Sequence, residues 1–495
     1  MSDIAGIRRA KGLTSDEVAE IDELLSVYDH TRGRSSRIED YYEGDVMARD
    51  IGIDILPPEA KNKVNVDLSC DWARKSVKAL ANHVRFDGFV FEGRDDVDEG
   101  LGRALDRLSF DSEFSRTRIG TLKKGCSFAT VNNFGTSAAI TFHTADSGAM
   151  VMNEATGRPR SGFVIADTGR TSWAPRRPVV TKVNLHMPGS RIEIVRDTQS
   201  QWHAERVETP PDVMMMVPFV YEPTDKKPLG GTRITKDVRS NIDDVLSVRL
   251  AIAVTRAFYA IPMRYVLGLT ENMYKALKDK PQWNMYINPI LLATMDRNGH
   301  MPAAGQLPSN SPESLIRLIE TDAKLFAAAT GVPLQSLGIV QDNPSSAEAI
   351  VEARRDLIED AQTFEDEQLK PALRQVALLA MMVEGNKARV DELDDVQRSV
   401  MPHFRNPAMP SIAATTDAAM KIASVNPAFA GTDVFFEMVG FDHATITRVN
   451  KQMRMNQLRA NARPILSQTI EGDLPQTAGT AVPAQPQVAP RTGEA

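Results

Sequence analysis

The chain has 495 residues, of which 42% are hydrophobic and 25% are charged, which is the composition of a globular protein with several domains. Its net charge of −7 argues against a protein that holds nucleic acid by broad charge attraction. Two cysteines, Cys70 and Cys126, cannot form a disulfide framework, so we expect a reducing compartment. We see no N-terminal signal peptide and no apolar run as long as a membrane span, which predicts a soluble protein, cytoplasmic where it is made.

The first 110 residues are predicted to be mainly helical. Thr14 and Glu17 have the spacing of a capping box that opens a helix through Leu25, and Ser36 with Glu39 repeats the pattern. A cluster of carboxylates then precedes the apolar positions of another helix. Such a cluster could bind a metal ion, but the dipole at a helix start also attracts acids, and we favour the second interpretation. These residues are Asp95, Asp96, Asp98 and Glu99.

Between about residue 125 and residue 221 the hydrophobic period changes to two. Alternating segments separated by Gly, Pro, Asn and Asp predict an antiparallel meander. Helices, then strands, then helices again make the fold class α+β. His186 and His203 could meet across this meander, but we interpret them as exposed strand histidines. The predicted strands are 126–131, 138–143, 179–186, 191–196 and 202–207.

Two helices are predicted to flank a small insert. The first runs over 235–259 with one apolar stripe, and Pro262 ends it. The second begins at Ser311 with Pro312 at its first position and stops at Gly331. The insert between them, 261–310, contains Asn298–Gly299, a strong hairpin signal.

A long helix is predicted to begin at Ser345. Pro344 precedes it, and Ser345 with Glu348 has capping-box spacing. The helix could extend to Gly385, with a kink at Pro371. A polar loop, 338–343, comes just before it. Short helices follow near 412–423 and 445–462, and the Pro- and Ala-rich end of the chain is expected to be disordered.

The motifs of common enzymes are missing from the sequence. We find no phosphate loop, no Gly-x-Ser-x-Gly elbow, no His-Glu-x-x-His pair and no histidines at metal-ligand spacing, and Gly100–Gly102 lacks the third glycine of a dinucleotide site. The carboxylates of the long helix could serve a two-metal nuclease. A solvated or subunit-facing helix surface explains them equally well, and we favour it because the sequence offers no partner histidine or lysine cluster. These carboxylates are Glu352, Asp356, Glu359, Asp360, Glu365, Asp366 and Glu367.

The order of these elements resembles the phage portal protein family, in the branch common among tailed phages of Gram-positive hosts. The resemblance rests on the order and spacing of short fragments over some 400 residues, and the series Gly-Val-Pro, short loop, Ser-Ser-Ala-Glu-Ala-Ile is the most telling. Phe404, where the family often has tryptophan, and Cys126, where it often has an aromatic residue, depart from the pattern. The fragments lie at 41–44, at 88–91 after the helix around Trp72, and at 125–128, 217–223, 330–333, 343–350, 404–411 and 417–421.

The resemblance implies a portal-type subunit that forms a ring, usually of twelve copies, around a channel for double-stranded DNA. It implies a helical and β wing over 1–232, a stem of two helices over 233–260 and 311–331, and a small α/β clip over 261–310. A tunnel loop region over 332–344 leads to the long wing helix and connector of 345–403. A helical crown over 404–462 and a disordered tail over 463–495 complete the chain.

The tunnel loop, about 338–344, would place Gln341, Asp342 and Asn343 toward the DNA. Its rigid base would begin at the cap formed by Ser345 and Glu348. On local sequence alone, an ordinary interhelix loop and cap is the favoured interpretation, and the order of the flanking elements reverses that preference. An acidic protein with polar loop residues suits a channel in which DNA slides, because each Lys or Arg contact with a phosphate adds affinity that movement must break.

In the family the clip faces the terminase, and later the head–tail adaptor. An aromatic pair rimmed by lysines is a plausible docking surface, although these side chains could equally be the core of the insert. They are Lys275, Lys278, Lys280, Trp283 and Tyr286.

The partners implied are copies of this chain, duplex DNA, the terminase large subunit, the head–tail adaptor, and the major capsid and scaffolding proteins, with no membrane and no cofactor. The implied location is the portal vertex of the virion, after assembly in the host cytoplasm. Two other functions stay open: a metal-dependent nuclease that uses Glu359 and Asp360, and a monomeric helical adaptor that binds a partner through the long helix.

Overall fold

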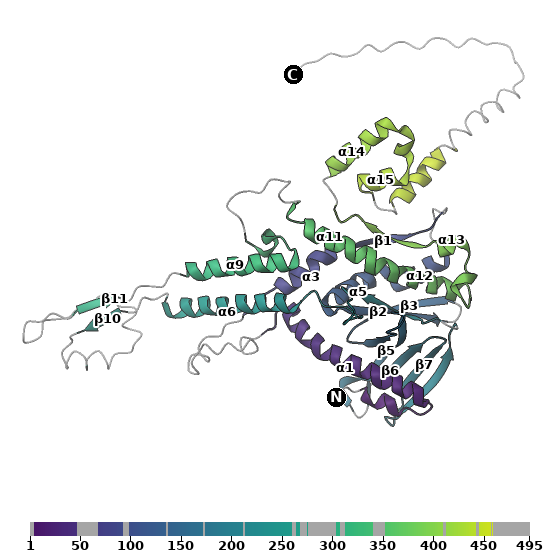
Figure 1. Ribbon diagram of the computed structural model, residues 1–495, viewed down its shortest axis with the longest axis horizontal. Helices are drawn as coiled ribbons and strands as arrows, with labels where there is room; N and C mark the ends of the chain where they lie inside the picture. Colours follow the sequence, from purple (N-terminus) through teal and green to yellow (C-terminus); the bar gives the residue numbers. More distant parts are fainter. Residues whose placement is uncertain are drawn as a thin grey trace, which may run out of the picture. The chain divides into compact units, whose positions relative to one another are not determined.

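The computed structural model has two units, Met1–Ala408 and Met409–Ala495 (Figure 1). The first mixes helices and sheets, and the second is helical, so the α+β class is confirmed in outline. The residues that the structure describes are 4–46, 68–92, 99–134, 137–171, 174–210, 213–259, 264–267, 275, 303–306, 312–339, 352–408, 412–441, 445–456 and 458.

The N-terminal helices begin with η1 (Ala5–Arg9) and α1 (Ser15–Glu43). The capping box at the start of α1 is confirmed, because Thr14 N donates to Glu17 Oε2 at 2.7 Å and Glu17 N donates to Thr14 Oγ1 at 3.4 Å. The second predicted box is wrong: Ser36 and Glu39 lie inside α1, which continues to the left-handed Gly44. Glu39 instead binds the Lys123 ammonium at 2.6 Å. The next helices are α3 (Trp72–His83), α4 (Glu99–Leu108) and α5 (Phe110–Lys124).

The strands form two separate sheets where a single meander was predicted. One sheet has the order β3-β2-β9, with β2 (Cys126–Phe134), β3 (Ser137–Thr144) and β9 (Met216–Val220). The other runs β4-β5-β6-β7-β8 and is antiparallel throughout. Its strands are β4 (Gly148–Met152), β5 (Pro159–Thr171), β6 (Ala174–Met187), β7 (Ser190–Arg196) and β8 (Trp202–Glu208).

A further two-stranded sheet links distant parts of the first unit. β1 (Arg85–Val90) pairs antiparallel with β12 (Met401–Arg405), so that Phe86 lies opposite Phe404. The first unit therefore continues through β12 to Ala408.

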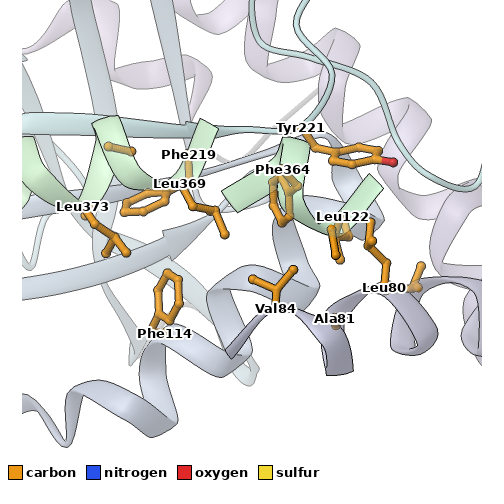
Figure 2. Close-up of a cluster of buried hydrophobic side chains, with 14 of the residues drawn as sticks. Leu80, Ala81, Val84, Phe114, Leu122, Phe219, Tyr221, Phe364, Leu369 and Leu373 are labelled. Atoms are coloured by element: carbon orange, nitrogen blue, oxygen red, sulfur yellow. The ribbon is translucent and has the colours of Figure 1, made fainter. Parts of the chain in front are cut away.

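Three hydrophobic clusters hold the first unit together. The largest joins α3, α5, α6, α9 and the long helix to one face of the β3-β2-β9 sheet, and Figure 2 shows part of it, including Phe114, Phe219 and Phe364. A second joins η1 and α1 to one face of the five-stranded sheet. The third lies between the two sheets. There Gly162 permits the close approach, since a Cβ at this position would lie 2.7 Å from Met216 Sδ.

The prediction that His186 is an exposed strand histidine is wrong, because this residue is only 1% exposed. The face of β6 that carries His186 is covered at this point, where Arg191 of the neighbouring strand donates to Asn132 Oδ1 of the other sheet at 2.7 Å, so a polar residue here does not have to face water. His186 lies opposite Arg191 in the β6–β7 register, and burial together with the Arg191 charge lowers its pKa to about 3. His143 on β3, whose Nε2 lies 3.1 Å from Thr130 Oγ1, has its pKa lowered by burial to about 4. His203 does not pair with His186; it lies 2.9 Å from Asp197.

The two predicted helices around the insert are α6 (Lys236–Tyr259) and α9 (Glu313–Thr330), which lie side by side (Figure 1). Short strands β10 (Arg264–Leu267) and β11 (Ala303–Gln306) pair antiparallel and close the base of the insert. The predicted turn at Asn298–Gly299 lies outside the described residues. After α9 comes η3 (Leu334–Leu337).

The long helix is described from α11 (Arg355–Thr363), through a π-helical turn, η4 (Phe364–Leu369), to α12 (Lys370–Glu384), and it ends at Gly385 as predicted. The π turn immediately precedes Pro371, which cannot donate to the helix, so the change in backbone pattern lies just before the predicted kink. Two short elements, η5 (Val390–Glu392) and α13 (Asp395–Arg398), lead to β12. The second unit contains α14 (Ile412–Val425), η6 (Pro427–Gly431) and α15 (Asp433–Val439).

Candidate functional site

The candidate site is the junction where α6, α9 and the long helix meet α3. At its centre is Arg233, which lies three residues before α6 and is 6% exposed. A buried guanidinium must find acceptors for its N–H groups, because desolvation of an unpaired charge is costly. The partners of Arg233 come from four different segments of the chain.

Each partner of Arg233 ties one element to the start of α6. Its Nε donates to the Ser76 carbonyl in α3 at 3.1 Å, and its Nη2 donates to the Thr330 carbonyl at the end of α9 at 2.5 Å. Its Nη1 lies 2.9 Å from the Tyr221 hydroxyl and 3.2 Å from Asp360 Oδ2 in α11. One side chain therefore fixes both flanking helices and the long helix relative to α3 and the segment that carries Tyr221.

The end of α9 is shaped to turn the chain back toward the long helix. Gly331 adopts φ +66°, a left-handed conformation that a residue with a Cβ enters only with strain, and its N–H caps the Ala327 carbonyl at 2.8 Å. Thr330 Oγ1 accepts from Val332 N at 3.4 Å. Val332 and Leu337 are buried, so the chain leading toward the predicted tunnel loop is anchored in the core.

The helix pair is held to the N-terminal region by further contacts. The Tyr41 hydroxyl of α1 lies 2.8 and 3.0 Å from the two carboxylate oxygens of Asp243 in α6. The Phe326 ring of α9 is fully buried and packs on Trp72 with ring centroids 5.1 Å apart. The family fragments around Tyr41 and Trp72 therefore position the helix pair.

The long helix contributes a buried carboxyl at its π turn. Glu365 is 4% exposed, and burial raises its pKa to about 8. Next to it, Phe364 packs edge-on against Tyr221 with centroids 5.2 Å apart (Figure 2). The π turn thus lies directly beside the Arg233 junction.

Four other carboxylates of the long helix have cationic partners. Arg355 pairs with Glu352 at 3.4 Å and with Glu359 at 3.1 Å, and Lys370 pairs with Asp366 at 2.5 Å. Asp360 pairs with Arg233. Across the described ranges, no group of three His, Cys, Asp or Glu side chains is arranged to hold a metal ion. In the same part of the chain, no helix is long and apolar enough to cross a membrane.

Most of the predicted site residues lie outside the described residues. This holds for the tunnel-loop residues Gln341, Asp342 and Asn343, and for the cap residues Ser345 and Glu348. Of the predicted docking surface, Lys275 is described and exposed. Lys278, Lys280, Trp283 and Tyr286 lie outside the described residues, as do Asp95, Asp96 and Asp98. Their roles stay predictions.

Arg233 was not predicted from the sequence. Its partners lie 157, 12, 127 and 97 residues away, at Ser76, Tyr221, Asp360 and Thr330. No periodic pattern or local motif reports contacts of that kind. Its place two residues after the pair Gly230–Gly231, where a chain can come close to other backbone, is the available local signal.

Residues 198–427 match the family described as phage portal protein, SPP1 Gp6-like. The portal protein of Mycobacterium phage D29 is 23% identical over 431 residues, which cover 82% of each chain. That of Mycobacterium phage L5 is 22% identical over 418 residues and 81% of each chain.

Among solved structures, a chain of the neck of a native GTA particle, computed with C12 symmetry, is 14% identical; the match covers 75% of this chain and 89% of that one, with a TM-score of 0.40. A structural similarity with a TM-score this low supports no conclusion about this chain. The match of residues 198–427, which includes Arg233, and the two mycobacteriophage relatives aligned over most of their length make this chain similar to phage portal proteins.

Proposed function

We propose that the protein forms a ring-shaped channel at one capsid vertex, through which double-stranded DNA is packaged and later ejected. The family match over residues 198–427 carries this proposal. In this assignment α6 and α9 are the stem, 261–310 is the clip, and 1–232 with 345–403 is the wing. The crown is 404–462, followed by the tail 463–495, and the ring has twelve copies.

The Arg233 junction supports a mechanical role for the loop between α9 and the long helix. The chain enters this loop from η3, where Leu337 is buried, and leaves it toward α11, where Leu357 and Ala361 are buried. A loop with two fixed ends can reach toward moving DNA without shifting its base. We assign Gln341, Asp342 and Asn343 to the channel lining, with Ser345 and Glu348 as the cap behind them.

Polar and acidic loop residues suit this role, because DNA has to slide past them. A lysine or arginine there would add a phosphate contact and release counterions, and movement would have to break that contact. We therefore expect that lysine at position 341 or 343 slows packaging in the infected host without preventing ring assembly. Packaging at the parent rate with both lysines present would contradict the assignment of the loop to the channel.

A photo-crosslinking amino acid tests the channel assignment directly. Placed at position 342 in assembled particles that hold DNA, it should crosslink to DNA. The matched control is Glu154, an exposed residue in the turn between β4 and β5. Crosslinking at position 154 but not at position 342 would refute the assignment.

The clip assignment is tested separately. We propose that Lys275, Lys278, Lys280, Trp283 and Tyr286 form the surface that binds the terminase large subunit and later the head–tail adaptor. Replacing the three lysines with glutamate should leave rings intact and remove terminase binding in a pull-down. If the rings fail to form, these side chains belong to the core of the insert instead.

The rest of the assignment follows the family. Portal proteins are structural, and we propose no catalytic activity for this chain, whose junction carboxylate Asp360 is held by Arg233. We place it in the virion, after assembly in the host cytoplasm with the major capsid and scaffolding proteins. Mg²⁺-dependent cleavage of plasmid, lost on changing Glu359 and Asp360, would favour the nuclease instead.

A further inference from the structure

The outer side of α9 carries large apolar side chains that face water. Among the described residues of the first unit, five large hydrophobic side chains are exposed, and three of them lie in α9. They are Ile316, Leu318 and Leu325, which are 48%, 49% and 55% exposed. α9 packs mainly on α6, and its fully buried ring is Phe326. Leu318 and Leu325, seven residues apart, therefore form a second apolar stripe, which no described part of the chain covers.

Two carboxylates lie beside this stripe. Asp322 comes four residues after Leu318 and three before Leu325, so it neighbours both on the helix surface. Burial and the charge of nearby Asp244 on α6 raise the pKa of Asp322. Among the described residues, neither carboxylate has an ion-pair partner, and like charges this close disfavour each other until a cation meets them. We call Asp244, Leu318, Asp322 and Leu325 the acidic face of the helix pair.

The opposite flank of α9 carries an exposed cation. Two residues turn an α-helix by about 200°, so Lys324 lies on the side of α9 away from Asp322. Ile316, eight residues earlier, lies on the same flank as Lys324. Arg317 on this flank already pairs with Glu313 at 2.8 Å. Glu320 lies one turn from Lys324, but among the described residues no ion pair holds Lys324. We call this side of α9 the Lys324 flank.

We propose that the acidic face of one copy docks on the Lys324 flank of a second copy of this chain. This inference rests on the proposed ring and adds the two surfaces that meet in it. A ring needs a heterologous interface, in which one surface of a copy meets a different surface of the next. The acidic face and the Lys324 flank are two such surfaces, with complementary charge and with apolar side chains on both.

The heights of these residues agree with a ring. Rotation about a ring axis involves no shift along the axis, so residues at one height in a copy meet residues at the same height in the next. Asp322 and Lys324 are two residues apart, which is at most about 3 Å along α9. Lys324 of one copy therefore comes level with the two carboxylates of its neighbour, while Leu318 and Leu325 leave water.

The native mass of charge-reversed variants, measured by light scattering, tests this proposal. Lys324→Glu and the double variant Asp244→Lys/Asp322→Asn each place like charges at every contact between copies, so the fraction of protein in rings should fall about tenfold or more. The two variants produced together should regain rings, because each contact between a copy of one kind and a copy of the other joins opposite charges. The matched controls are Lys226→Glu and Asp225→Lys in an exposed turn, and both should form rings as the parent does.

The outcomes separate this inference from the proposed function. Rings in the parent and equally in Lys324→Glu would overturn the inference and leave the ring itself standing. A parent that stays monomeric, even when produced with its capsid and scaffolding proteins, would overturn both. Equal losses in the variants and the controls would mean a general sensitivity to charge and would overturn the inference alone. Thermal unfolding of each variant near the parent temperature establishes that it is folded, and Leu318→Asn/Leu325→Asn should also lose rings.

Discussion

Replacing Arg233 with methionine should loosen the junction of the helix pair without unfolding the five-stranded sheet. Methionine fills similar volume but leaves the Ser76 and Thr330 carbonyls without their donor, and an unsatisfied buried acceptor costs about 1–3 kcal/mol. Asp360 has a side chain that is 49% exposed, so water replaces most of its lost partner. The local opening free energy at the end of α9 should therefore fall by about 4 kcal/mol.

Hydrogen exchange measured by mass spectrometry reports this loss where it occurs. A fall of about 4 kcal/mol corresponds to roughly a thousandfold faster exchange for amides that open locally. We expect the effect in peptides covering Phe326–Leu337 and the start of α11, with little change in the five-stranded sheet. The control is Arg317→Met on α9, whose side chain is 74% exposed and pairs with Glu313. Unchanged exchange at Phe326–Leu337 in the Arg233 variant would refute the role assigned to this residue.

Three other predictions concern stability. Burial lowers the pKa of His186 to about 3 and that of His143 to about 4, whereas an unfolded histidine has a pKa of about 6.5. The stability is therefore full above pH 6.5 and should fall with acidification by up to about 1.4 kcal/mol per pH unit for each histidine. Melting temperatures that do not change between pH 7 and pH 4.5 would contradict this. Phe326→Ala should cost about 3–5 kcal/mol in chemical unfolding, whereas its neighbour Leu325, 55% exposed, should cost under about 1 kcal/mol, and equal losses would disprove the packing described. Gly331→Ala should cost about 1–2 kcal/mol because of its positive φ, and a stabilised variant would show that the turn is not under this constraint.

Local signals in the sequence predicted a helix boundary well where capping residues next to that boundary determine it. The Thr14–Glu17 box, the end of α9 at Gly331 and the end of the long helix at Gly385 all follow from caps and left-handed residues. The break predicted after Leu25 was wrong, because α1 packs along β4 and β5 and tertiary contacts outweigh a second capping signal.

The division of the strands into two sheets could not be predicted in this way. β4 is buried along most of its length, so it has no polar alternation to reveal it. β2 pairs with β9 from a distant part of the sequence, and β1 pairs with β12 from farther still. The burial of His186 has the same origin, since the alternation rule assumes that polar strand positions face water, and at His186 that face is covered by contacts distant in sequence.

The sequence predicted the helices that form the site, but it did not predict the central residue, Arg233. The sequence order located the helix pair, the insert and the long helix, because each has a strong start or stop signal. Arg233 was missed because its function depends on four acceptors that only the folded chain brings together. Residues at a junction of this kind carry no local pattern of their own.

The most direct test of the portal assignment is the native mass of the purified protein by light scattering, with electron microscopy of the same peak. Twelve copies of the 54.5 kDa chain weigh about 650 kDa. We predict rings near that mass with a central hole wide enough for a duplex. A protein that stays monomeric, even when produced together with its capsid and scaffolding proteins, and that cuts DNA would contradict the assignment.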